Sequence, residues 1–211
     1  NMTQELSTKQ EPTYMQITVS GITYNCMAQR FSVKAERLDP GNGRLQHLSQ
    51  KLSHEEAFDA LAGEEDTKKL RDAIAHNQGL LEQQFVSLLS EEGNFEALVR
   101  EGNRRRVALE LILNGIETGK LKLDRKKFET VVAWVYPNDM PEEHILLHIA
   151  SMHNSESGKK GWDKLNQAAY IANLRAMKDV SDDDIVKGLQ ISKSTLQKQA
   201  KAYEQTKKYG D

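Results

Sequence analysis

The chain has 211 residues, a formal net charge of −2 and a single cysteine, Cys26. These values allow one medium domain or two small ones, and they exclude a disulfide within the chain. They also leave nucleic-acid binding to a local basic surface, since the molecule as a whole is not a polycation. No apolar run approaches the roughly 20 residues of a membrane helix, and the N-terminus lacks the layout of a signal peptide. We therefore expect a cytoplasmic protein without a membrane partner.

The first third of the chain predicts extended structure, then a loop, then a helix. Residues 1–13 are polar, and we expect a flexible N-terminus there. β-Branched and apolar residues over 14–24 predict extended structure interrupted at Gly21. Proline and glycines within 38–44 predict a loop. A helix is expected from a cap at Asp66 or Thr67 to the C-terminal signal Asn77-Gln78-Gly79.

The middle of the chain alternates strands and helices. Residues 85–89 predict a buried strand, and the alternation of Phe95, Ala97 and Val99 predicts its hairpin partner. Gly102-Asn103 ends that strand, and apolar residues at helical spacing then predict a helix that stops at Asn114-Gly115. Residues 128–136 predict a further strand, closed by Pro137.

No strand is expected after Pro141, where apolar spacing predicts two helices followed by two shorter ones. The predicted fold class is α+β, a small mixed sheet with helices followed by an all-helical domain. We place an α/β domain at 14–140 and a helical domain at 141–211.

The segment from Val99 to Ala108 predicts a strand that enters a tight turn opening a helix. A helix start leaves backbone N–H groups unpaired and carries partial positive charge, and glycine lets a ligand approach the backbone. Arg104, Arg105 and Arg106 beside Gly102 therefore suit a phosphate group. The alternative is that the three arginines form a solvated helix face.

The order of these motifs resembles the N-terminal domain of the ParB/sulfiredoxin-like superfamily over roughly residues 36–200. Leu38-Asp39-Pro40 with Arg44 resembles that family's N-P-R loop, and residues 70–81 resemble its helix ending in E-H-G-L-L. Gly102-Asn103-Arg104-Arg105 resembles the G-E-R-R signature. Residues 151–170, with His153-Asn154, Gly158 and Trp162, resemble the segment that follows the E-N-x-Q-R signature.

The resemblance implies that the turn and the later helix hold the phosphates of a nucleotide, CTP or ATP with Mg²⁺. The implied phosphate-binding residues are Gly102, Asn103, Arg104, Arg105, Arg106, His153 and Asn154. Asn103 and His153 stand where the family has glutamates, and Mg²⁺ prefers carboxylate oxygens. Glu101 is the carboxylate that could take a catalytic role; the alternative is an exposed turn residue. Sulfiredoxin chemistry is set aside, because it needs a cysteine at the position of Asn103.

The C-terminal region predicts two short helices joined by a tight turn, with caps at Ser181 and Ser192. A second helix rich in Lys, Gln, Ser and Thr is typical of helix-turn-helix units near residues 181–203 that read the major groove. Gln190 replaces the usual turn glycine and would need an uncommon left-handed conformation or a different turn. The predicted DNA-binding residues are Lys193, Ser194, Thr195, Gln197, Lys198 and Lys201. The alternative is a helical hairpin with a polar outer face.

Function remains open among three classes at this point. The first is a ParB-like DNA-binding protein of partition or transcription-regulator type, nucleoid-associated and dimeric by family analogy. The second is an enzyme: a CTPase, a Mg-dependent nuclease or a nucleotide-dependent kinase. The third is a non-enzymatic adaptor that holds a protein partner. No metal site is predicted: His144 and His148 lie four apart, but no third ligand accompanies them.

Overall fold

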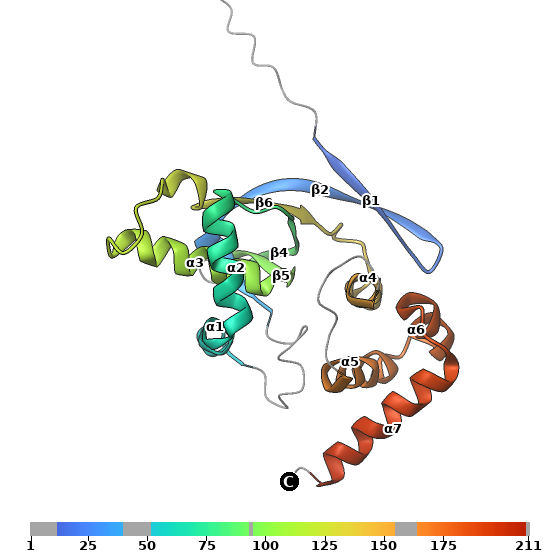
Figure 1. The fold of residues 1–211 in the computed structure, drawn as a ribbon. Helices are drawn as coiled ribbons and strands as arrows, with labels where there is room; N and C mark the ends of the chain where they lie inside the picture. The colour runs from blue at the N-terminus through green and yellow to red at the C-terminus, as the bar shows by residue number, and fades with distance from the viewer. Residues whose placement is uncertain (1–11, 40–51, 93–94, 155–163, 210–211) are drawn as a thin grey trace, which may run out of the picture.

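The computed structural model describes residues 12–39, 52–92, 95–154 and 164–209 (Figure 1). Within these ranges, six strands form one mixed sheet in the order β1-β2-β6-β4-β5-β3. The strands are β1 (Tyr14–Val19), β2 (Ile22–Ser32), β3 (Glu36–Leu38), β4 (Gln84–Glu92), β5 (Phe95–Glu101) and β6 (Thr130–Val135). Neighbours pair antiparallel except β3 with β5 and β4 with β6, which are parallel. The predicted α+β class with a small mixed sheet is confirmed.

The first two strands form a hairpin around Ser20 and Gly21, both of which have positive φ (51° and 80°). This conformation matches the twist of the flanking strands, and the small side chains tolerate it. The strand predicted to end at residue 24 continues to Ser32, because the second half of β2 pairs with β6. That pairing joins residues about a hundred positions apart, so local sequence could not predict it.

Seven α-helices accompany the sheet in the described residues. They are α1 (His54–Gly63), α2 (Glu65–Asn77), α3 (Asn103–Glu117), α4 (Glu142–Asn154), α5 (Lys164–Ala176), α6 (Asp182–Leu189) and α7 (Lys193–Tyr209). The expected helix before Gly79 is α2, whose N-cap is Glu64 and not Asp66 or Thr67. Sequence analysis missed α1, although Ser53 and Glu56 form a capping box at its start.

Two predicted helix lengths were wrong. Helix α3 passes the expected stop at Asn114-Gly115 and ends at Glu117. Gly115 lies inside the helix, where Leu121 packs so closely that its Cδ1 would be 2.7 Å from a Cβ at this position. The last helix, α7, has 17 residues and is the longest of the seven, so it is not one of two short helices.

The sheet carries apolar clusters on both faces, as alternation along β6 requires. Val131 joins the side chains of α2 and α3 in one cluster. Trp134 belongs instead to a larger cluster that extends to α4, α5, α6 and α7.

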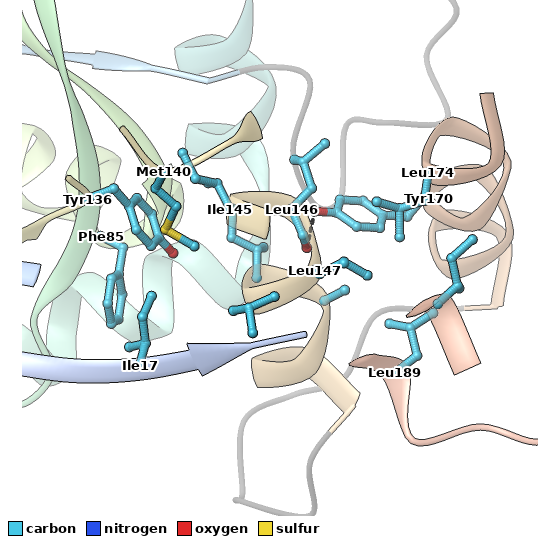
Figure 2. Close-up of a cluster of buried hydrophobic side chains, with 14 of the residues drawn as sticks. Ile17, Phe85, Tyr136, Met140, Ile145, Leu146, Leu147, Tyr170, Leu174 and Leu189 are labelled. Atoms are coloured by element: carbon cyan, nitrogen blue, oxygen red, sulfur yellow. Dashed lines mark hydrogen bonds between the residues drawn. The ribbon is translucent and has the colours of Figure 1, made fainter. Parts of the chain in front are cut away.

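The larger cluster crosses the expected domain boundary at residues 140–141. Figure 2 shows Phe85 and Tyr136 of the sheet region on one side of α4, and Tyr170 and Leu174 of α5 on the other. The Tyr170 hydroxyl donates to the backbone carbonyl of Leu146 at 2.7 Å. Helix α4 therefore packs against both the sheet and the C-terminal helices, and the division into two domains remains a prediction. None of the helices described above is long and apolar enough to cross a bilayer.

Candidate functional site

The turn between β5 and α3 is built on Gly102, the N-cap residue of α3. Its φ is +104°, a conformation that disfavours any residue with a side chain. A Cβ at this position would lie 2.8 Å from Cγ of Gln84, so the glycine also permits the Gln84 side chain to pack directly against the backbone. Because Gly102 supplies no capping side chain, the partial positive charge of the helix start is left for another group to meet.

Arg105 lies in the first turn of α3 and contacts two carboxylates. Its Nη1 donates to Oε2 of Glu82 at 2.8 Å, and its Nη2 pairs with Glu101. Its Nε is buried and has no hydrogen-bond partner among the described residues. This Nε would lie 3.1 Å from a Cβ at Gly102, so an unsatisfied donor sits beside the glycine turn. A buried donor without a partner is costly, and it points to an anionic ligand at this turn.

Glu101, the last residue of β5, connects the turn to α4. Its side chain is 8% exposed, and Oε1 lies 3.8 Å from Nε2 of His153 in the last turn of α4. The structure thus brings together four of the predicted residues: Glu101, Gly102, Arg105 and His153. The alternative of an exposed turn residue is wrong for Glu101, because the carboxylate is buried between two basic side chains.

A second ion-pair group holds the other end of α4. Arg100 is buried and contacts Asp39 at 3.4 Å and Glu142, the first residue of α4. The backbone N–H of Asp39 donates to Oδ1 of Asn103 at 3.0 Å. Asn103, predicted as a phosphate ligand, therefore has a structural contact to the chain after β3.

Arg106 points away from the turn and into the protein. Its side chain is 2% exposed, and its Nε donates to the backbone carbonyl of Glu36 at 3.1 Å. Its Nη1 pairs with Glu110 one helical turn later. Because Arg106 is buried, the alternative that it belongs to a solvated helix face is wrong. Its contacts with Glu36 and Glu110 also give no support to a role in phosphate binding.

Glu36 is fully buried behind the turn. When the side-chain amide of Gln84 is oriented with its nitrogen toward Glu36, this nitrogen donates to both carboxylate oxygens of Glu36, at 2.8 and 3.1 Å. Burial raises the pKa of Glu36 to about 8, although Arg106 opposes the shift. The interior beneath Gly102 is therefore a polar network that holds Gln84 and Arg106 in place.

The remaining predicted residues of this site lie on the same elements. Arg104 is half-buried in the first turn of α3. Asn154 is the last residue of α4, but its side chain lies outside the described part of the structure, as do Pro40, Arg44, Gly158 and Trp162. Glu82 was considered only as a metal-holding carboxylate for an enzyme, and Arg100 was not predicted, because only tertiary packing brings their side chains to these partners.

Helices α6 and α7 join through a short turn, as predicted. Ser181 and Asp184 form a capping box at the start of α6, and Oγ of Ser192 accepts from the N–H of Thr195 at 3.1 Å. Gln190 adopts the left-handed conformation that its position requires, with φ of 52° and ψ of 38°. The unit thus forms without the usual turn glycine.

The predicted DNA-binding side chains share the outer face of α7. Lys193, Ser194, Gln197, Lys198 and Lys201 are exposed and Thr195 is half-buried, whereas Leu196 and Ala200 are buried in the core. Nε2 of Gln199 donates to Gln167 of α5 at 2.6 Å, which fixes the rotation of α7. Lys193 lies 3.4 Å from Asp183 in an exposed pair, a contact worth little in water.

The two histidines that we considered as zinc ligands have other contacts. Nδ1 of His144 lies 2.6 Å from the Tyr24 hydroxyl, and Nδ1 of His148 lies 2.8 Å from the Tyr136 hydroxyl. Within the described ranges, no three His, Cys, Asp or Glu side chains gather as a metal site would require.

Comparison with known proteins gives structural neighbours but no family. No family model and no curated protein matches the chain. Among solved structures, the chain is similar to C-terminally truncated chromosome-partitioning protein ParB from Caulobacter crescentus, complexed to the centromeric parS site. The TM-score is 0.46 at 14% identity, over 81% of this chain and 69% of that one. The same protein complexed with CTP-gamma-S gives a TM-score of 0.37 at 15% identity, over 80% and 74%.

Proposed function

We propose that this chain is a ParB-like DNA-binding protein of partition or transcription-regulator type. The observation that carries the proposal is the outer face of α7. The exposed lysines and the exposed amide of Gln197 lie on one face of α7, because Leu196 and Ala200 bury the opposite face in the core. Lys193 and Lys198 would contact phosphates, and Gln197 would read a base edge in the major groove. In this proposal α6 and α7 form the helix-turn-helix of a helical domain at 141–211.

Duplex DNA binding at about 50 and about 200 mM salt tests this proposal. Lys198→Ala should weaken binding to every sequence and reduce the salt slope by about one. Gln197→Ala should cost about 1–3 kcal/mol on the preferred sequence alone. Asn173→Ala, which removes an exposed amide from α5, is the matched control. If the wild type does not bind at low salt, or if both α7 variants behave as the control does, the proposal is overturned.

We further propose that the turn at Glu101–Arg106 binds a nucleotide, CTP or ATP. Gly102, Arg104 and Arg105 would hold the phosphates, with the start of α3 supplying backbone donors. The buried Nε of Arg105 supports this assignment, since a phosphate oxygen would satisfy it. Mg²⁺, if it accompanies the nucleotide, would neutralise part of the phosphate charge; His153 and Asn154 lie on the helix that would close over it.

Calorimetric titration with CTP, ATP and Mg²⁺ tests the nucleotide site. A charge-assisted hydrogen bond contributes about 1.5–3 kcal/mol, so Arg104→Ala should weaken binding by about tenfold or more. Arg71→Ala on α2 removes an arginine from outside the turn and is the control. Absence of binding by both nucleotides would overturn this part and leave the DNA proposal standing.

The ion pairs of α4 suggest how a nucleotide would act on the rest of the protein. Glu142 at its start and His153 at its end both contact residues beside the turn. Phosphate binding would draw α4 and its packed helices against the turn, closing a clamp in a homodimer. Crosslinking between protomers that neither CTP nor ATP increases would contradict this mechanism.

A further inference from the structure

The densest run of positive charge in the sequence lies away from α7, in the segment 118–127 that follows α3. It contains five Lys or Arg residues and one Asp, a formal charge of +4. The whole chain is −2, so all other residues together sum to −6. Residues 182–201, which include most of the helix-turn-helix unit, sum to only +1 because Asp182, Asp183 and Asp184 offset their four lysines. Segment 118–127 is therefore a dense cationic stretch outside α7, which itself sums to +4 over Lys193–Tyr209.

The backbone of this segment is anchored to α3 and to the apolar cluster beneath it. The N–H of Leu121 donates to the carbonyl of Gly115 at 2.9 Å, and Leu121 packs on the glycine itself. Leu121 and Leu123 contact the apolar cluster beneath α2 and α3, and Phe128 is buried in it. Asp124 caps the short 3-10 helix Arg125–Lys127 through the N–H of Lys126 at 3.1 Å.

This anchoring decides where the lysines point. Since Leu121 and Leu123 are turned inward, Lys120 and Lys122 alternate with them and are exposed, as is Lys126. The nearby carboxylates are taken by other basic groups: Glu117 by Lys34 and Arg125, and Glu129 by Arg125. Lys120, Lys122 and Lys126 have no ion pair with any described residue. Their charges are therefore available to a partner.

The segment is well separated from the helix-turn-helix unit. In Figure 1 the yellow-green chain after α3 lies at one end of the molecule, and α6 and α7 lie at the other. A single small ligand cannot contact both. A long anion that runs along the protein could do so.

We propose that Lys120, Lys122 and Lys126 form a second contact surface for the phosphate backbone of duplex DNA. Separate lysines on an anchored, exposed segment suit sequence-independent contact with spaced phosphates, because each ammonium group acts as a point charge. The surface would contribute on-rate and salt-dependent affinity, while α7 contributes register and sequence preference. The choice of DNA as the polyanion rests on the proposed function; the surface itself does not include α7.

The test compares charge reversals at matched positions. Lys120→Glu with Lys122→Glu should reduce the slope of log K against log salt by about 1.8, at about 0.9 per lost phosphate contact. Lys68→Glu with Lys69→Glu on α2 changes the net charge equally at two exposed lysines and is the control. Circular dichroism checks that both variants remain folded. An equal effect of the two variants would overturn the proposal.

A third variant separates this inference from the proposed function. Lys193→Glu with Lys198→Glu alters α7 alone. Loss of DNA binding in the α7 variant, with wild-type binding in the Lys120/Lys122 variant, would overturn the second surface and leave the helix-turn-helix standing. The reverse pattern would support the surface and reject α7. If the Lys120/Lys122 variant lost affinity for single-stranded RNA but not for duplex DNA, the assignment to DNA would be wrong.

Discussion

Oε1 of Glu101 lies 3.8 Å from Nε2 of His153, so the end of β5 contacts the last turn of α4 beside the glycine turn. The same carboxylate pairs with Arg105, whose other terminal nitrogen binds Glu82. Two carboxylates therefore hold the guanidinium that we propose as a phosphate ligand. A phosphate at this turn must compete with them, and the weaker competitor is Glu82, whose side chain is 56% exposed.

Removing the Glu82 charge should strengthen phosphate binding. Glu82→Gln leaves the shape of the side chain but weakens its hold on Arg105. An exposed ion pair contributes up to about 1 kcal/mol, so the Kd for inorganic triphosphate should fall by up to about fivefold. Titration of Glu82→Gln beside Glu96→Gln, an exposed carboxylate elsewhere on the sheet, measures this effect. A weaker affinity in Glu82→Gln than in the control would show that Glu82 assists binding.

Gly102→Ala should destabilise the protein. The new Cβ would meet Cγ of Gln84 at 2.8 Å, and the φ of +104° adds strain. Together these effects should cost about 1–3 kcal/mol of unfolding free energy. Gly119→Ala is the control, since Gly119 also has positive φ (71°) but has open space around it. Urea unfolding of both variants separates the clash with Gln84, which only Gly102→Ala introduces, from the backbone strain, which both share. Equal losses of unfolding free energy would show that the contact with Gln84 adds nothing.

Stability should fall as the pH rises through the pKa of Glu36. Burial raises that pKa to about 8 in the folded protein, above the usual value of 4.5. The folded state then binds more protons than the unfolded state between these values, so stability is full below about pH 4.5 and declines toward about pH 8. Glu36→Gln should flatten this dependence in urea unfolding at several pH values. If unfolding free energy changes with pH equally in Glu36→Gln, Glu96→Gln and wild type, the pH dependence does not come from the raised pKa of Glu36.

Gln190→Gly should stabilise the turn between α6 and α7. Gln190 ends α6 in the left-handed conformation, which costs a residue with a side chain about 1 kcal/mol relative to glycine. Part of that gain is offset by the greater entropy of glycine in the unfolded chain. Thermal unfolding should show a net gain of about 0.5 kcal/mol. Gln197→Gly, within α7, should instead lose about 1 kcal/mol; a loss in both variants would argue against the left-handed turn.

Local sequence predicted the elements whose signals lie within one segment. The stop of α2, the β4–β5 hairpin, and the glycine turn that opens α3 were all predicted from adjacent residues, because stop signals and alternation act over a few positions, whereas the predicted cap of α2 was wrong. The two helices around Gln190 were predicted for the same reason, whereas the structure decided between a left-handed Gln190 and a different turn. The exposed face of α7 follows from the spacing of Leu196 and Ala200.

Only the tertiary structure decided the partners and directions of the charged side chains. Arg104, Arg105 and Arg106 are consecutive in sequence, yet Arg106 is buried against Glu36 while Arg105 contacts Glu82 and Glu101. A helix turns each successive residue by about 100°, and what each then meets depends on strands distant in sequence. The sequence by itself determined that a basic glycine turn opens one helix and that the last helix has a polar outer face. Pairing of β4 with β5 places Glu82 and Glu101 beside Arg105, and packing of α4 brings His153 to the same turn, because long-range contacts fix those positions.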